Sequence, residues 1–213
     1  MLTASLTCVV QAQLQRGPGR IWQGVRANGA NVLTITAGHA IDALCAVLGE
    51  FAEVSARVST RIPEWRTLEG NAVPVDSPDS INVIGRMVSG AEVSINVAAV
   101  PSNPGGNRIE IYGREGTLVL RADGSFNTGG SEVHGGRGKE PMASMPVPSK
   151  YRVVPERTPA GQPYNVAQAY ARAADALRGR GSFDVDFSLA VQRHKLIDAI
   201  ERSAATGRSV KVE

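Results

Sequence analysis

The sequence is poor in the residue types that mark several classes of protein. Cys8 and Cys45 are the two cysteines in 213 residues, and neither stands in a Cys-x-x-Cys or Cys/His spacing. No disulfide framework or zinc site is therefore expected, and both thiols, which sit in apolar stretches, are predicted to be buried in a reducing compartment. Aromatic residues make up 5% of the chain and are dispersed, so no base-stacking platform stands out.

The chain also lacks a strong charge of one sign. The 23 Lys and Arg residues oppose 20 Asp and Glu residues, for a formal net charge of +3, and the arginines are scattered from Arg16 to Arg208. Nucleic-acid binding usually requires a basic patch or stripe, so no nucleic-acid partner is expected. Four of the positive residues are lysines, which leaves few candidates for lysine chemistry.

No dinucleotide fingerprint and no membrane segment are recognised. Gly17-Pro18-Gly19 has Trp22 where the third glycine of a phosphate-binding turn would fall. No run of about 18 apolar residues and no basic leader occur, so neither a membrane partner nor secretion is expected and the predicted location is cytoplasmic. No cofactor and no metal are expected for this chain itself.

The chain contains helix and strand patterns along its length, and we expect them to form a single domain, residues 1–213. Apolar residues recur at helical spacing in segments 31–48, 165–177 and 187–205. They alternate with polar residues, as in strands, in segments 3–13, 51–61, 81–88, 91–100, 108–112, 117–121 and 210–212. The prediction is an α+β fold with an open, predominantly antiparallel sheet of about six strands and helices packed on one face.

Turn residues refine this prediction. Ser89-Gly90 predicts a tight hairpin between segments 81–88 and 91–100, and Gly113 to Gly116 predicts a second hairpin. Residues 15–29 are expected to form a long loop, and residues 122–163, rich in Gly, Pro and Ser, to form short ribbons and loop. The alternating apolar residues of segment 91–100 are expected to need cover on both faces of the sheet; they are Val93, Ile95, Val97 and Ala99.

One pair of residues carries a candidate chemistry. His39 and Asp42 are three residues apart in the predicted helix 31–48, so they share a helix face. An imidazole held by a carboxylate acts as a general acid or base near neutral pH. The alternative, from spacing alone, is a surface histidine with an acidic neighbour.

Three blocks of sequence, in this order, resemble a known family. They are Gly38-His39-Ala40-Ile41-Asp42-Ala43-Leu44, the segment 108–118, and the segment 187–203 followed by Thr206-Gly207-Arg208. Together they resemble the C-terminal domain of the GFO/IDH/MocA oxidoreductases, which use NAD or NADP on sugars, polyols and related substrates. Leu33-Thr34-Ile35-Thr36 before Gly38-His39 is similar to the branch that contains the fungal galactose-pathway repressor.

The resemblance implies a substrate-binding and dimerisation domain. His39 matches the family's proton-transfer position, whereas Ile35 stands where many members carry an Asp, which leaves Asp42 as the substitute carboxylate. Trp22, Arg26 and Asn28 are expected to hold polar groups of a sugar-like substrate. NAD or NADP would belong to a full-length parent, and the second face of the sheet would form a homodimer or a higher homo-oligomer.

Two departures from the family leave the function open. The family's nucleotide domain and its Glu-Lys-Pro segment are not found; Lys139-Glu140-Pro141 has the reverse order. The chain is then expected to be one half of an oxidoreductase, either a piece of a longer chain or a naturally short product, and inactive alone. The alternative is a non-catalytic ligand-sensing or regulatory module similar to the galactose-pathway repressor.

Overall fold

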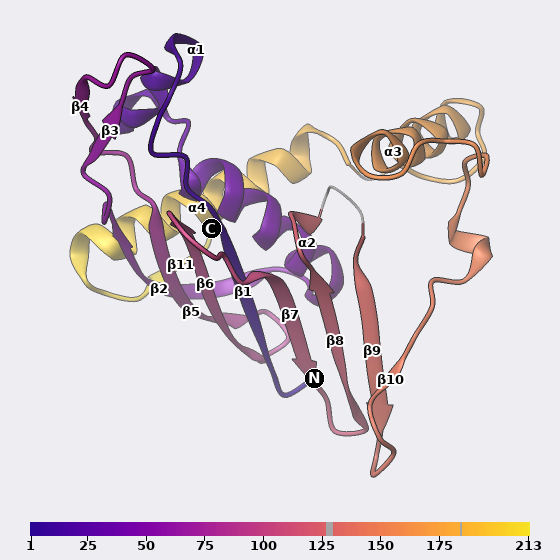
Figure 1. Cartoon of the computed structure of the whole chain (residues 1–213). Coiled ribbons are helices and arrows are strands. Elements are labelled where there is room, and N and C mark those ends of the chain that lie inside the picture. The colour runs from indigo at the N-terminus through magenta and orange to yellow at the C-terminus, as the bar shows by residue number, and fades with distance from the viewer. Residues whose placement is uncertain (127–129, 184) are drawn as a thin grey trace.

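The computed structural model describes residues 1–126, 130–183 and 185–213, and its main feature is a nine-stranded sheet in the order β10-β9-β8-β7-β1-β6-β5-β2-β11 (Figure 1). The strands are β1 (Thr3–Gln11), β2 (Phe51–Ser59), β5 (Ser80–Met87), β6 (Glu92–Val100), β7 (Gly106–Tyr112), β8 (Gly116–Ala122), β9 (Glu132–Arg137), β10 (Ala143–Ser144) and β11 (Val210–Lys211). All neighbours are antiparallel except β1 and β6, which run parallel. The predicted α+β class and both hairpins are confirmed.

The sheet is wider than expected because β9 and β10 form within the segment predicted as ribbon and loop. β9 contains Gly135 and Gly136, and β10 is two residues long, so neither shows an alternating apolar pattern. A separate ribbon joins β3 (Glu64–Arg66) to β4 (Ala72–Pro74).

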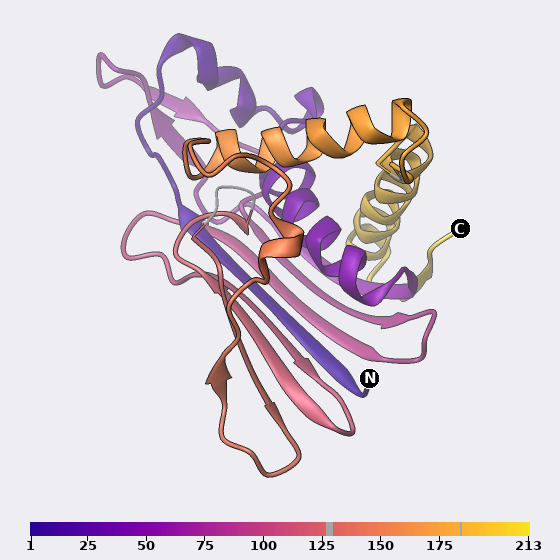
Figure 2. The ribbon, with the colours of Figure 1, turned by 90° about the vertical axis from the view of Figure 1, so that its right-hand side faces the viewer.

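Helices lie on one side of the sheet (Figure 2). They are α1 (Pro18–Ile21), α2 (Gly38–Leu48), α3 (Gln162–Leu177) and α4 (Phe187–Thr206), with 3-10 turns η1 (Trp22–Gly24), η2 (Arg26–Asn28) and η5 (Ser149–Tyr151) and a π-helical turn η3 (Val32–Ala37). The three predicted helices are confirmed. The predicted loop 15–29 is partly helical, since α1, η1 and η2 lie in it, but each has only three or four residues and leaves no periodic pattern.

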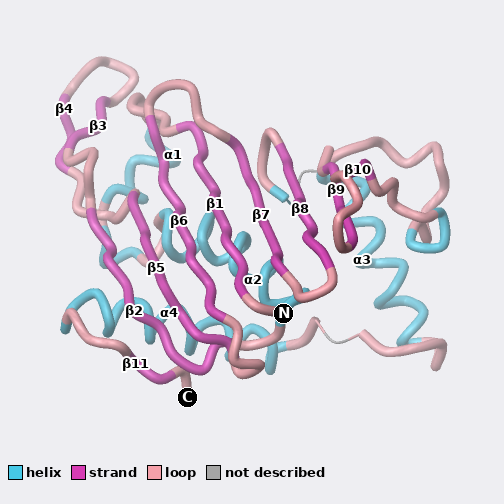
Figure 3. The backbone as a smooth tube through the Cα atoms, turned by 90° about the horizontal axis from the view of Figure 1, so that it is seen from below, coloured by secondary structure: helices cyan, strands magenta, loops and turns pink. Residues whose placement is uncertain are grey.

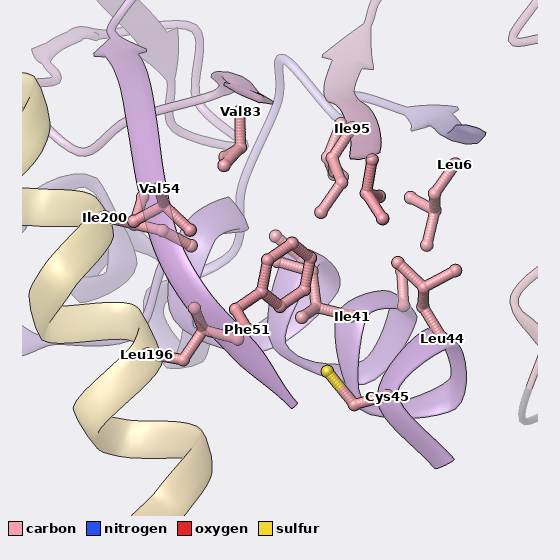
Figure 4. Close-up of a cluster of buried hydrophobic side chains, with 14 of the residues drawn as sticks. Leu6, Ile41, Leu44, Cys45, Phe51, Val54, Val83, Ile95, Leu196 and Ile200 are labelled. Carbon is pink, nitrogen blue, oxygen red and sulfur yellow. The ribbon is translucent and has the colours of Figure 1, made fainter. Parts of the chain in front are cut away.

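The core lies between the sheet and helices α2 and α4 (Figure 4). Ile41 and Leu44 of α2 and Leu196 and Ile200 of α4 are buried against strand residues that include Leu6. Burying a side chain of this size contributes about 1.5–3 kcal/mol, so these two helices are fixed on the sheet by apolar contact. α3, in contrast, has no buried residue.

The opposite face of the sheet is polar, which corrects one prediction. Val93, Ile95 and Val97 are buried on the helix side, whereas Ser94 and Asn96 alternate with them on the other side. The neighbouring strands follow the same register, with Ser5 opposite Ser94 and Thr7 opposite Asn96. The expectation that the apolar residues of β6 need cover on both faces was wrong, because strand alternation puts them all on the helix side. Figure 3 views the sheet from this side, with the helices behind it.

The segment Arg26–Leu48 is long and apolar enough to cross a membrane by length and composition alone, with a mean hydropathy of 1.5. Core helices of globular proteins pass the same test. Leu33, Ile41 and Leu44 in this segment are fully buried against the sheet, which is the arrangement of a core helix.

Candidate active site

The candidate site lies where the helical segment of η3 and α2 begins. Asn31 caps the segment: its Oδ1 accepts from the backbone N–H groups of Leu33 and Thr34 at 2.9 and 3.2 Å, and Oγ1 of Thr34 accepts from the Asn31 N–H at 3.1 Å. This reciprocal pair satisfies three donors at the start of the helix. The first turn is π-helical and passes into α2 at Gly38. Single π-helical turns frequently occur at functional sites.

His39 and Asp42 line one cavity of about 350 Å³. Ala40 and Ala43 of α2 complete one wall, and Ser125, Phe126 and Asn165 form the other. His39 is exposed, so its imidazole is accessible to a ligand. The structure thus brings the two predicted catalytic residues to the same cavity, as their spacing on one helix face predicted.

Asp42 is bound by a residue from the last helix. Oδ1 of Asp42 accepts from Nε of Arg193 at 2.8 Å, and the Arg193 guanidinium also donates to both carboxylate oxygens of Glu50 at 2.5 and 2.8 Å. The Arg193 side chain is 11% exposed, whereas that of Asp42 is 51% exposed. The hydrogen bond from Arg193 lowers the pKa of Glu50, and its two carboxylate partners raise the pKa of Arg193. Arg193 therefore holds the Asp42 side chain in place in the lining of the His39 cavity.

The three predicted substrate-binding residues hold their own loop together. Nε1 of Trp22 donates to the Gly19 carbonyl at 3.0 Å, and Nδ2 of Asn28 donates to the Trp22 carbonyl at 2.7 Å. Arg26 forms a salt bridge of 3.2 Å with Glu201 of α4. Within the described part of the chain, the lining of the His39 cavity includes none of the three. Their role in substrate binding stays a prediction.

The second wall of the cavity was not foreseen from the sequence. Ser125 and Phe126 follow β8, and Asn165 belongs to the first turn of α3, so they are 86 to 126 residues from His39 along the chain. No local motif marks them, because only the tertiary fold brings them to α2. Among residues 1–126, 130–183 and 185–213, no group of three or more His, Cys, Asp or Glu residues has the arrangement of a metal site.

The described residues do not form the glycine-rich turn that binds the pyrophosphate of a dinucleotide in many nucleotide-binding domains. A pyrophosphate site needs a glycine-rich turn between a strand and a long helix. Gly17 and Gly19 follow β1, but the helix there, α1, has four residues, and Gly38 lies inside a continuous helical segment.

Comparison with known proteins identifies the relatives of this site. Residues 20–122, which include His39 and Asp42, match the family described as Gal80p, C-terminal domain. An uncharacterized oxidoreductase of Synechocystis is 29% identical over 136 residues, which are 61% of this chain and 36% of that protein.

Solved structures show the same fold over the whole chain. A super-repressor mutant of Gal80p from Saccharomyces cerevisiae superposes with a TM-score of 0.80 at 22% identity and covers 100% of this chain. Levoglucosan dehydrogenase, in complex with NADH and levoglucosan, superposes with a TM-score of 0.80 at 22% identity and covers 99% of this chain. The matched region spans 58% of the Gal80p chain and 58% of the levoglucosan dehydrogenase chain. It spans 36% of the Synechocystis oxidoreductase.

These findings agree on one domain type. Two of the three blocks that carried the resemblance in the sequence, at Gly38-His39 and at 108–118, lie within the matched range 20–122, and the third, at 187–208, lies outside it. Residues 20–122 are thus similar to the C-terminal domain of Gal80p, and the chain as a whole has the fold found in Gal80p and in levoglucosan dehydrogenase.

Proposed function

We propose that this chain is the substrate-binding and dimerisation domain of an NAD(P)-dependent oxidoreductase that acts on a sugar or polyol-like substrate. The observation that carries the proposal is the position of His39. It is exposed on the first turn of α2, at a cavity it shares with Asp42, which Arg193 holds in place. The similarity to levoglucosan dehydrogenase supports a sugar-like substrate.

In this proposal His39 exchanges a proton with a hydroxyl group of the substrate. A neutral imidazole accepts a proton near neutral pH and returns it in the reverse direction. Asp42, three residues along the helix, lines the same cavity, and Arg193 fixes the orientation of its carboxylate. Ile35 stands on the preceding turn and is 43% exposed, so no carboxylate acts from that position.

NAD or NADP belongs to the longer protein in this proposal. When bound, the cofactor supplies the redox chemistry, and it is held by a domain outside the described residues. The isolated chain is accordingly expected to bind no dinucleotide tightly and to turn over no substrate. Titration calorimetry that gives a micromolar dinucleotide affinity would contradict this expectation.

We also propose that the polar sheet face forms a homodimer. A hollow of about 420 Å³ on this face is lined by hydroxyl and amide side chains, among them Ser5, Asn82 and Asn96, and by the exposed apolar side chain of Ile84. The hydroxyl and amide side chains provide donors and acceptors to a second copy of the same face. Light scattering at several protein concentrations measures the mass, and a monomer at all of them would contradict the proposal.

The second candidate function is a regulatory module that binds a ligand without chemistry. The match of residues 20–122 to the Gal80p domain and the apolar Ile35 favour it. In this case the cavity at His39 senses a ligand and dimer contacts transmit the signal. Ligand binding without turnover distinguishes this function from catalysis.

The experiment uses the protein in its full natural length. NAD- and NADP-dependent turnover is measured on a panel of sugars and polyols for the wild type and for His39→Asn, with His194→Asn as the matched control because His194 is exposed on α4. Loss of a general acid or base reduces turnover about 100-fold or more. Equal turnover of wild type and His39→Asn would remove the catalytic role, and binding without turnover in the wild type would favour the regulatory module.

A further inference from the structure

A second cavity lies beside the start of the same helical segment. It has a volume of about 180 Å³ and is enclosed by the end of β1, the β3–β4 ribbon, the loop before β5 and η3. Arg16, Arg20 and Trp65 line one side, and Ile35 and Thr36 line the other. Ile35 precedes His39 by four residues on the continuous helical segment, so the cavity adjoins the turn that carries His39.

Two arginines contribute to this cavity without a carboxylate partner. Within residues 1–126, 130–183 and 185–213, no salt bridge includes Arg16 or Arg20, although ten others are formed. The Arg16 guanidinium carbon lies 4.3 Å from the centre of the Trp65 ring, and its Nε donates to the Gln13 carbonyl at 2.8 Å. The cation is therefore held in place by stacking and one hydrogen bond, with its Nη groups left for a ligand.

The two positive charges repel each other. Burial lowers the pKa of Arg16, and the charge of Arg20 lowers it further. Both arginines line the same cavity without a carboxylate partner, and an anion bound in it would offset their repulsion.

The acidic residue of the cavity does not neutralise them. Asp79 is 9% exposed, and its two carboxylate oxygens accept from the backbone N–H groups of Arg61 and Ile62 at 2.8 and 2.7 Å. These two hydrogen bonds engage the Asp79 carboxylate with the backbone of the loop that follows β2. The lining thus has two positive charges and one negative charge, and the negative one is already hydrogen-bonded.

We infer that this cavity binds the oxyanionic group, a carboxylate or a phosphate, of a small polyol. Guanidinium groups bind both oxyanions through pairs of parallel hydrogen bonds, and Trp65 supplies an apolar surface beside them. The volume suits one such group and not a whole dinucleotide. The polyol part of the ligand rests on the proposed function, whereas the charged group rests on Arg16 and Arg20 alone. Together with the proposed function, this site makes the expected substrate a sugar acid or a sugar phosphate.

The test measures binding to the 213-residue chain by titration calorimetry at low salt. D-gluconate is compared with neutral D-sorbitol for the carboxylate, and glucose 6-phosphate with glucose for the phosphate. At least one anion is expected to bind about tenfold or more tightly than its neutral counterpart, with an affinity that falls as potassium chloride is added. The pair with the larger ratio identifies the oxyanion.

Variants assign the binding to this cavity. Arg20→Gln is expected to weaken binding of the anion about tenfold, whereas Arg20→Lys, which keeps the charge, retains most of it. Arg172→Gln changes the net charge equally but lies on α3, far from α1 (Figure 1), and is expected to leave the affinity unchanged. Arg20 is exposed, so its variants are expected to fold, and circular dichroism checks this. Arg16→Gln is the second variant with the same expected loss.

Three results would overturn the inference: equal affinity for acids and neutral polyols, no binding of either anion, or an equal loss in Arg20→Gln and Arg172→Gln. Sorbitol binding as tight as gluconate would remove the anion site and leave the proposed sugar function intact. Anion binding that depends on Arg20, with turnover unaffected by His39→Asn, would remove the catalytic function and leave the site.

Discussion

Arg193 on α4 donates through Nε to Oδ1 of Asp42 on α2 at 2.8 Å, although 151 residues separate the two along the chain. The same guanidinium binds Glu50 at the end of α2 through both of its Nη groups. One side chain of the last helix therefore fixes both the His39 helix and the turn that leads from it into β2.

Arg193→Ala is expected to lower the free energy of unfolding by about 1–3 kcal/mol. The value is below that for a fully buried ion pair, because both carboxylates keep contact with water. Urea unfolding followed by circular dichroism measures it. Arg202→Ala is the matched control on the same helix: its bond to Asp198 is exposed, so a change of about 0.5 kcal/mol or less is expected. Equal effects of the two variants would remove the special role of Arg193.

Stability is expected to fall with acidification through Glu50. The hydrogen bond from Arg193 lowers the pKa of Glu50 in the folded state. A carboxylate with a lowered folded pKa stabilises the protein above its unfolded pKa, and this contribution is lost as the pH falls through the folded value. The difference in unfolding free energy between wild type and Glu50→Gln should therefore be constant near pH 7 and shrink below about pH 4.5. A difference that grows on acidification would contradict the assignment.

Gly85→Ala is expected to destabilise the sheet strongly. A Cβ at position 85 would lie 2.8 Å from two ring carbons of Phe51 and 2.9 Å from the Glu53 carbonyl oxygen. Phe51 is buried in the core, so relief of this overlap requires movement of the ring or of the β2 backbone. A loss of about 1–3 kcal/mol or more is expected in urea unfolding. Gly105→Ala, where a Cβ meets nothing within 4 Å, is the control and should be nearly neutral.

Both cysteines are expected to be unreactive in the folded protein. Burial raises the pKa of Cys8 to about 11 and that of Cys45 to about 12, so almost no thiolate is present at pH 8. A chromogenic disulfide reagent should detect nearly no thiol at this pH until urea is added, and two per chain afterwards. Rapid reaction of one thiol in the folded chain would show that its burial is incomplete.

Local patterns in the sequence determined the long helices and the central strands of this protein, but not the short elements such as α1, β9 and β10. Apolar spacing defined the helices now seen as α2, α3 and α4, and strand alternation with Gly90 at φ 84° defined the hairpin of β5 and β6. The resemblance around Gly38-His39 identified the domain type, because it depends on residues that are contiguous. The pairing of His39 with Asp42 on one helix face follows from helical geometry alone.

The tertiary structure decided everything that depends on contacts between distant segments. The sequence does not reveal that Arg193 binds Asp42 or that Ser125 and Asn165 line the His39 cavity. Nor does it reveal that Arg16 stacks on Trp65 and lines one cavity with Arg20. Alternation in β6 predicted a strand with one apolar face, and only the register of β1, β5 and β6 placed the serine and asparagine side chains together on the other. The physical reason is that propensity and periodicity act over a few residues, whereas charge pairing and cavity shape depend on which elements pack together.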